Sequence, residues 1–173
     1  MKLTTEQLLN NIDKYSAGTK IELSGTVYTA RDQAHKRLIE LIKQKKQLPI
    51  NLKNVCIYYC GPCPNSPKQI IGSCGPTTSS RMDIYTPTIL NNGVKILIGK
   101  GKRNTDVVNS IKINKAIYLL ATGGVGALLA KKVKKFELVA FEDLGPEAIY
   151  RLEIEGFPLI VGIDSTGKTL FNV

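Results

Sequence analysis

Apolar positions along this chain follow two different periods in neighbouring segments. Residues 20–29 place apolar side chains near every second position and predict a strand, with Gly25 as a break or bulge. Residues 32–42 follow a helical period and predict a helix that Asp32 caps. The buried stripe of that helix would consist of Ala34, Leu38, Leu41 and Ile42. This pairing of a strand with a helix is typical of an α/β protein.

The rest of the chain continues the alternation. Thr4 and Gln7 form a capping-box pair that predicts a helix start near residue 4. Further strands are predicted at 55–59, 70–71, 95–98, 116–121, 136–141, 159–163 and after 168, and further helices at 105–111 and 127–133. We therefore expect a largely parallel sheet, whose ligands gather beyond the carboxyl ends of the strands.

Composition limits the class of protein. The chain has 173 residues, of which 43% are hydrophobic, which favours one folded domain over residues 1–173. No apolar run approaches the roughly 20 residues that span a bilayer. The first residues lead into a polar helix and not into a signal-peptide core. We therefore expect a cytoplasmic protein with no membrane partner.

The net charge of +10 favours anionic partners. Nucleic acid, acidic protein and small carboxylates or phosphates all fit, and so does a solvated lysine-rich surface without a ligand. A nucleic-acid-binding module stays open as an alternative, but the chain lacks interleaved aromatic residues and a recognised binding motif.

The strongest candidate for chemistry is the loop of residues 75–83. Gly75 and Pro76 predict a turn after a strand, and residues 77–80 are four consecutive hydroxyl side chains. A hydroxyl could cap a following helix, and the free N–H groups at that helix start would favour an anion. Arg81 adds a planar group that grips a carboxylate with two hydrogen bonds.

Three other segments place polar residues or glycines at predicted strand ends. Arg31 lies just before the helix at 32–42, where it could point into the same crevice, and Lys100 lies between two glycines. His35, the single histidine, could act as an acid or base, but a structural role is favoured. The glycines of residues 123–126 do not form a dinucleotide motif and favour close packing or a crevice wall.

Four cysteines lie within 19 positions: Cys56, Cys60, Cys63 and Cys74. Without a signal peptide, free thiols or a metal site are favoured over disulfides. Cys60 and Cys63 have the spacing of redox and zinc motifs, but Pro64 disfavours the helix that a redox pair normally opens. A cysteine-based metal or redox protein stays a minor alternative.

Together these segments resemble the C-terminal, or β-subunit, region of the iron–sulfur class I fumarase and L-tartrate dehydratase family. The matching stretches are 25–37, 75–83, 98–101, 123–129 and 142–149. The resemblance implies a swivelling β/β/α domain with a mostly parallel central sheet. It also implies a hydro-lyase that hydrates fumarate to L-malate, with dehydration of L-tartrate to oxaloacetate as the alternative.

The family's 4Fe-4S cluster is held by cysteines of another region, where one iron acts as a Lewis acid on the departing hydroxyl. The resemblance therefore implies a cluster-bearing α subunit as partner, a heterotetramer as assembly and no metal on this chain. It leaves Cys60 and Cys63 without a role.

The resemblance also assigns four site residues. Thr77 matches the threonine that moves the carbon-bound proton, and Arg31, Arg81 and Lys100 match residues that bind substrate carboxylates. Elementary chemistry supports the assignment of Arg31, Arg81 and Lys100, because a substrate with two negative charges needs about two positively charged side chains to bind it. A threonine hydroxyl is a weak base, so Thr77 needs nearby positive charge or a partner base.

Overall fold

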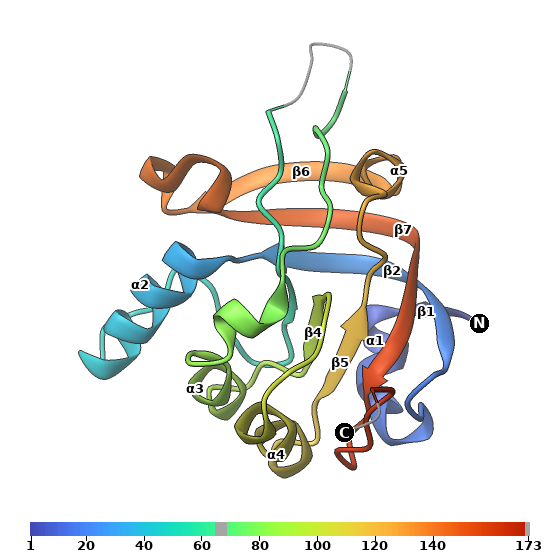
Figure 1. Ribbon diagram of the computed structural model, residues 1–173. Coiled ribbons are helices and arrows are strands. Elements are labelled where there is room, and N and C mark those ends of the chain that lie inside the picture. The colour runs from blue at the N-terminus through green and yellow to red at the C-terminus, as the bar shows by residue number, and fades with distance from the viewer. Residues whose placement is uncertain (65–68, 172–173) are drawn as a thin grey trace.

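The computed structural model describes residues 1–64 and 69–171, and a closed sheet forms its centre (Figure 1). The strands of the described ranges are β1 (Lys2–Thr4), β2 (Lys20–Thr29), β3 (Cys56–Tyr58), β4 (Ile96–Gly99), β5 (Ile117–Leu120), β6 (Val133–Ala140) and β7 (Ile149–Ile163). Their order is β1-β2-β3-β4-β5-β7-β6, and an additional pairing joins β2 to β7. That pairing closes β2, β3, β4, β5 and β7 into a barrel.

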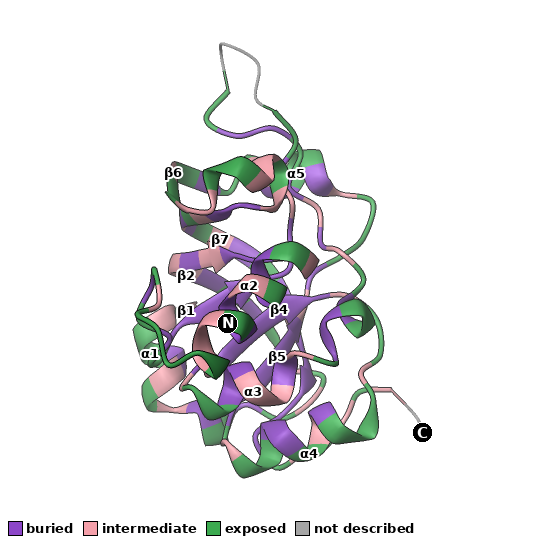
Figure 2. Cartoon of the chain, turned by 90° about the vertical axis from the view of Figure 1, so that its left-hand side faces the viewer, coloured by how far each residue is buried: buried purple, intermediate pink, exposed green. Residues whose placement is uncertain are grey.

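Helices cover the outside of this barrel. They are α1 (Thr5–Asn10), α2 (Asp32–Lys43), α3 (Thr86–Asn91), α4 (Thr105–Ile113) and α5 (Gly126–Ala130), with 3-10 turns η1 (Ile12–Lys14), η2 (Ser79–Met82) and η3 (Glu142–Glu147). Helices α2, α3 and α4 follow one another along one side, and α5 lies apart near β6 and β7 (Figure 1). In the view of Figure 2, the buried colour runs through the strands, and the exposed colour marks outward faces of the helices.

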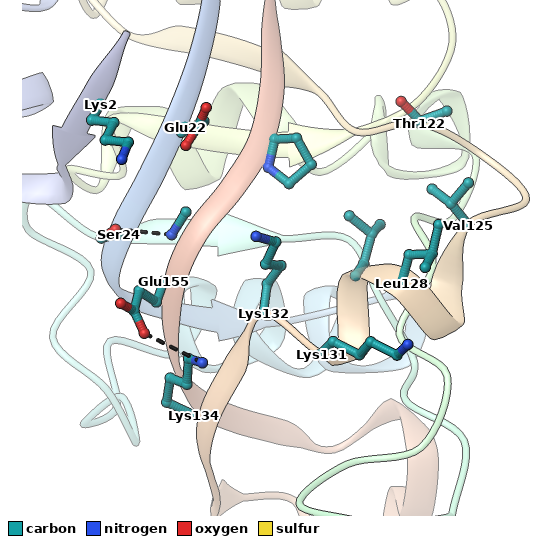
Figure 3. Close-up of a pocket in the computed structure, with 13 residues that line it drawn as sticks. Lys2, Glu22, Ser24, Thr122, Val125, Leu128, Lys131, Lys132, Lys134 and Glu155 are labelled. Carbon is teal, nitrogen blue, oxygen red and sulfur yellow. Dashed lines mark hydrogen bonds and ion pairs between the residues drawn. The ribbon is translucent and has the colours of Figure 1, made fainter.

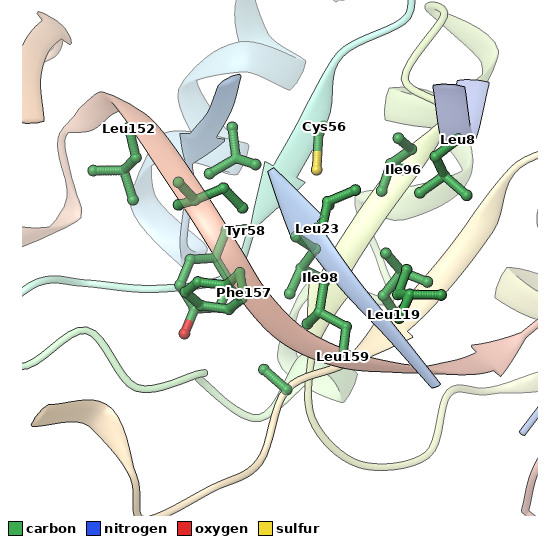
Figure 4. Close-up of a cluster of buried hydrophobic side chains, with 14 of the residues drawn as sticks. Leu8, Leu23, Cys56, Tyr58, Ile96, Ile98, Leu119, Leu152, Phe157 and Leu159 are labelled. Carbon is green, nitrogen blue, oxygen red and sulfur yellow. The ribbon is translucent and has the colours of Figure 1, made fainter. Parts of the chain in front are cut away.

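The period of two along the strands separates two cores. Cys56 and Tyr58 of β3 point into the barrel, where the cluster of Figure 4 fills the interior. Ile57 and the following Tyr59 point outward and pack under the helices. The same alternation holds in β4 and β5, which explains why both strands are apolar at every position. Barrel and helices are thus fixed to each other by residues of the same short strands.

Local sequence signals are confirmed at several element ends. The Thr4 hydroxyl accepts the N–H of Gln7 at 3.1 Å, and the Gln7 side chain accepts the N–H of Thr4 at 2.9 Å. Strand β2 has the predicted bounds, and its register with β7 shifts between Leu23 and Gly25. Gly25 has φ +122°, and an added Cβ would lie 2.5 Å from Thr5 Oγ1, so the bulge needs glycine.

The α/β class is confirmed, but the sheet is more mixed than the sequence predicted. Strands β1 to β5 pair in parallel in the order β1-β2-β3-β4-β5, whereas β7 is antiparallel to β2, β5 and β6. The prediction gave only 159–163 to this last strand, which in fact has 15 residues. Gly156 and Pro158 interrupt its pattern, yet pairing along β2 carries the strand through both.

Several short elements were predicted wrongly. Residues 70–71 form bends and not a strand, and Ile70 is 51% exposed. The helix predicted to reach Val133 ends at Ala130, because Val133 already pairs with β7. Within residues 169–171, the predicted strand is reduced to an isolated bridge between Thr169 and Ile163. Strand β1 and helix α3 were not predicted, since three and six residues carry too little periodicity.

The buried face of α2 also differs slightly from the prediction. Ala34 and Leu38 are buried as expected, but Leu41 and Ile42 are only half-buried. His35 and Ile39 complete the buried face instead. In the described ranges, no helix combines the length and the apolar character that crossing a membrane requires.

Candidate active site

The four predicted site residues gather at the carboxyl ends of adjacent parallel strands. Arg31 lies two residues after β2, and Lys100 follows directly after β4. Thr77 belongs to the loop 75–83, and its N–H donates to the carbonyl of Tyr59, the first residue after β3, at 2.7 Å. Because β2, β3 and β4 are parallel neighbours, their ends meet at one edge. The four residues therefore belong to one edge of the sheet, while the crevice and their roles stay predictions.

Hydrogen bonds join the loop 75–83 to the end of β4. The Ser79 N–H donates to the Lys100 carbonyl, and the Lys100 N–H donates to Ser79 Oγ, both at 3.0 Å. The Tyr118 hydroxyl lies 2.9 Å from the same Ser79 oxygen. A Cβ at Gly99 would lie 1.9 Å from Ser79 Oγ, so glycine permits this close approach. The loop is therefore held in place by backbone contacts and a buried serine.

The predicted anion site at a helix start is not supported. The loop leads into η2, a 3-10 turn of four residues, and its N-cap Thr78 makes no side-chain cap. The N–H groups of Thr77 and Ser79 are already bonded to carbonyls. Thr77 itself is half-buried, and its hydroxyl has no hydrogen-bond partner among residues 1–64 and 69–171. The groups of this loop that remain available to a ligand are the Thr77 hydroxyl and the Arg81 side chain.

Two carboxylates fix the two arginines. The Arg81 Nε donates to Asp32 Oδ1 at 3.0 Å, and its Nη2 lies 2.9 Å from Asp32 Oδ2. Arg31 lies 3.9 Å from Asp32 Oδ2 through Nε and 3.5 Å from Glu147 through Nη2. The Arg31 side chain crosses Gly61, where an added Cβ would lie 2.8 Å from it. The prediction that Asp32 caps the helix is wrong: Asp32 is the first residue of α2, and its carboxylate instead bonds Arg81, 49 positions away, a partner that the sequence did not show.

Lys100 supplies the third cation. An added Cβ at Gly123 would lie 3.8 Å from Lys100 Nζ, so the ammonium passes over the glycine-rich turn that follows β5. Close packing, one of the two expectations for glycines 123–126, holds at Gly126, where an added Cβ would lie 2.8 Å from Gly75 N; a crevice wall stays a prediction. In the described part of the chain the ammonium has no carboxylate partner within an ion-pair distance. Three cations against two carboxylates leave the site with a positive excess, which favours an anionic ligand.

A buried ion pair beneath the site was not predicted. Arg103 Nε lies 2.6 Å from Asp83 Oδ1, with side-chain exposures of 0% and 8%. The guanidinium lies over the rings of Tyr59 and Tyr118, 5.2 and 5.0 Å from their centroids, and donates to Thr86 Oγ1 at 2.7 Å. Asp83 ends the loop 75–83, so this pair fixes the loop from below. In the sequence, Arg103 is only one more basic residue of a basic segment, and nothing there indicates its buried partner.

His35 is structural, as the sequence analysis favoured. Its ring is fully buried, and Nδ1 donates to the Arg31 carbonyl at 2.8 Å, which fixes the backbone just before α2. Burial lowers the pKa of His35 to about 4, so the ring is neutral at neutral pH. It packs against the rings of Tyr59 and Tyr85, 5.4 and 6.1 Å away between centroids.

This pKa predicts acid sensitivity of the fold. The folded pKa of about 4 lies below the ordinary 6.5, so the unfolded chain binds the proton first as pH falls. The His35 contribution is complete above pH 6.5 and is lost between 6.5 and 4, by about 3 kcal/mol. His35→Asn keeps a donor for the Arg31 carbonyl without the titration. Urea unfolding at pH 7 and pH 4 should show a smaller acid loss in the variant; equal losses would contradict the assignment.

The four cysteines are free thiols in the structure. Cys56, Cys60 and Cys74 are buried, and burial raises the pKa of each thiol, that of Cys74 to about 12. A redox nucleophile needs the opposite shift. Cys63 is exposed. Across residues 1–64 and 69–171, no three His, Cys, Asp or Glu side chains are grouped to hold a metal ion, so these residues do not fit an iron–sulfur cluster.

A large cavity lies away from this site. It has a volume of about 850 Å³ and opens beside α5, between β2, β6 and β7 (Figure 3). Its charged lining comes mainly from exposed lysines, namely Lys2, Lys131, Lys132 and Lys134. Lys134 pairs with Glu155 at 3.3 Å, as Figure 3 shows. None of the four predicted site residues lines it, so we place the candidate site at the strand ends.

The family model described as "Fumarase C-terminus" matches residues 1–173. The chain belongs to the fumarase C-terminus family. The resemblance inferred from the five sequence stretches is thereby confirmed, and the candidate site lies on two of them, residues 25–37 and 75–83.

Relatives of two kinds support this membership. The anaerobic class I fumarate hydratase of Escherichia coli is 37% identical over 169 residues, which cover 96% of this chain and 31% of that protein. The putative L(+)-tartrate dehydratase subunit beta of Methanocaldococcus jannaschii is 37% identical over 168 residues, 94% of this chain and 86% of that protein. The E. coli L(+)-tartrate dehydratase subunit beta is 35% identical over 173 residues, which cover 97% of this chain and 85% of that protein. The chain thus spans about a third of this fumarate hydratase and most of each β subunit.

Proposed function

We propose that this chain is the β-subunit part of a hydro-lyase that reversibly hydrates fumarate to L-malate. The observation that carries the proposal is the gathering of Arg31, Arg81, Lys100 and the free Thr77 hydroxyl at one sheet edge. Three cations suit a dicarboxylate, and bidentate arginines give orientation as well as charge. The fumarate hydratase relatives supply the reaction class.

Within this proposal, Thr77 carries the proton that is added to or removed from carbon. Its N–H is fixed on Tyr59 and its hydroxyl has no partner among the described residues, so the hydroxyl is available to a ligand. Positive charge at Lys100, on the segment bridged to the neighbouring Thr78, would lower the cost of a negative oxygen there. The partner acid or base would come from the other subunit.

The cofactor and partner belong to the same proposal. The cysteines described above do not fit a cluster, so we assign the 4Fe-4S cluster to an α subunit. This chain would close the active site against that subunit in a heterotetramer, and the swivelling β/β/α arrangement would place its strand ends toward the cluster. The names of the β-subunit relatives support a heteromeric assembly.

L-Tartrate dehydration to oxaloacetate is the second candidate. The length of the chain favours this candidate, because two relatives that it matches over most of their own length are tartrate dehydratase β subunits. Both substrates carry two carboxylates, which the three cations would bind alike. A substrate panel on the complex with the α subunit decides between them: fumarate and L-malate should be interconverted faster than L-tartrate is consumed, and the reverse order would establish the second candidate.

The carboxylate clamp can be tested at Arg81. Arg81→Lys keeps the charge but loses the two parallel hydrogen bonds, so KM for the dicarboxylate should rise about tenfold or more. Steady-state kinetics of the complex measures this. Lys134→Arg, in the exposed pair with Glu155, serves as the matched control and should leave KM unchanged. An unchanged KM in Arg81→Lys would remove this residue from the carboxylate site.

A further inference from the structure

Asp32 occupies a position between the two arginines of the candidate site. Its carboxylate accepts the Arg81 Nε at 3.0 Å and lies 2.9 Å from Arg81 Nη2. Arg31 approaches the same carboxylate from the preceding position, with Nε 3.9 Å from Oδ2. The side chains of Asp32 and Arg31 are only 21% and 23% exposed, whereas that of Arg81 is 52% exposed. One carboxylate thus lies beside both guanidinium groups and binds that of Arg81 through two atoms.

The atoms that Asp32 contacts leave a usable face on Arg81. A guanidinium offers two edges to carboxylates, one formed by Nε and Nη2 and one formed by Nη1 and Nη2. Asp32 takes the first edge of Arg81. Of the second edge, Nη2 is shared with Asp32, whereas Nη1 makes no hydrogen bond or ion pair to any part of the chain that the structure describes, and half of the side chain is open to solvent. A substrate carboxylate can bind there without displacing Asp32.

Two atoms of this network are buried without a hydrogen bond. Arg31 Nε and Asp32 Oδ2 have no hydrogen-bond partner within the described ranges. Glu147 lies 3.5 Å from Arg31 Nη2 and accepts the N–H of Gln33 at 2.9 Å, so the far side of Arg31 is also held. Buried polar atoms are nearly always bonded. Ion pairs compensate the charges of these two atoms, since Asp32 Oδ2 lies 3.9 Å from Arg31 Nε and 2.9 Å from Arg81 Nη2.

We propose that Asp32 is a positioning residue, which holds Arg81 by its Nε/Nη2 edge and so presents the Nη1/Nη2 edge to the substrate carboxylate. The proposal rests on the proposed function, because it gives Asp32 its role through Arg81. It explains why an acidic residue lies in a site for anions, where its charge alone would oppose binding. What Asp32 contributes is the orientation of Arg81, since a binding group misplaced by about 1 Å loses much of its effect.

A purely structural role makes a different prediction. Asp32 is the first residue of α2, and a carboxylate in the first turn is favoured by the helix dipole. If that were its whole function, its removal would lower thermal stability and leave KM unchanged. A positioning role raises KM, and a side chain that restores the negative carboxylate restores part of the binding.

The test compares Asp32→Asn and Asp32→Glu in the complex with the α subunit. Asp32→Asn should raise KM for the dicarboxylate about tenfold, with a smaller change in kcat, and Asp32→Glu should recover part of the loss. Asp143→Asn is the matched control, because it removes a two-bond ion pair between the same helix and η3, at Arg37. That control should leave KM as in the wild type. An unchanged KM in Asp32→Asn would overturn the proposal.

A second readout separates this inference from the proposed function. In proton–nitrogen NMR spectra of this chain, the Nε–H of Arg81, assigned by its loss in Arg81→Lys, should exchange slowly in the wild type and fast in Asp32→Asn. Equal exchange in both would overturn the ion pair itself. A wild-type complex that converts no dicarboxylate while slow exchange persists would instead overturn the proposed function, and with it the catalytic purpose given to Asp32.

Discussion

Thr77→Ala in the assembled enzyme is expected to lose about 100-fold or more in kcat, the range for removing a proton-transfer group. The folded chain should keep its stability, because no described residue is hydrogen-bonded to this hydroxyl and the backbone bond to Tyr59 remains. KM should change little, since the carboxylate anchors are untouched. Steady-state kinetics and thermal unfolding of the same preparation measure both effects.

The neighbouring hydroxyl provides the control for this variant. Thr78 is exposed and meets Lys100 only through its backbone, so Thr78→Ala should retain turnover. Thr77→Ser keeps a hydroxyl and should recover a substantial part of kcat. Full turnover in Thr77→Ala would show that the proton moves through another group.

The second large effect concerns stability. Arg103→Met leaves the Asp83 carboxylate buried with only the N–H of Asn104 and should lower the free energy of unfolding by about 3–5 kcal/mol. The reason is the uncompensated charge, so Arg103→Met combined with Asp83→Asn should be more stable than Arg103→Met alone. Urea unfolding at pH 7 measures the three proteins.

An exposed ion pair tests how much of this loss in the free energy of unfolding is due to burial. Arg37 and Asp143 form a two-bond ion pair at the surface, so Arg37→Met should cost far less than Arg103→Met. If both variants lose the same stability, burial is not the cause. If Arg103→Met combined with Asp83→Asn is no more stable than Arg103→Met alone, the uncompensated buried charge is not the cause of the loss.

Features that depend on neighbouring residues could be predicted from the sequence. The capping box of Thr4 and Gln7 needs only four residues, and the bounds of β2 follow from a ten-residue alternation. The candidate site was predictable for a related reason. Arg31 lies two residues after a parallel strand and Lys100 directly after one, and parallel strands bring their ends together at one edge of the sheet.

Features that depend on distant pairing could not be predicted. Strand β7 continues through Gly156 and Pro158 because it pairs with β2, which lies more than 120 positions earlier, and the same pairing closes the barrel. The contact of Asp32 with Arg81 and that of Asp83 with Arg103 join residues 49 and 20 positions apart. Each is fixed by the fold, and neither leaves a periodic signal in the sequence.

The most direct test of the account is fumarate hydration by the purified complex of this chain with a cluster-bearing α subunit, compared with each subunit alone. We expect L-malate to form only when both are present, because the proposed function assigns the carboxylate anchors and the proton carrier to this chain. Equal turnover by the α subunit alone, or no turnover of any dicarboxylate by the cluster-loaded complex, would contradict it.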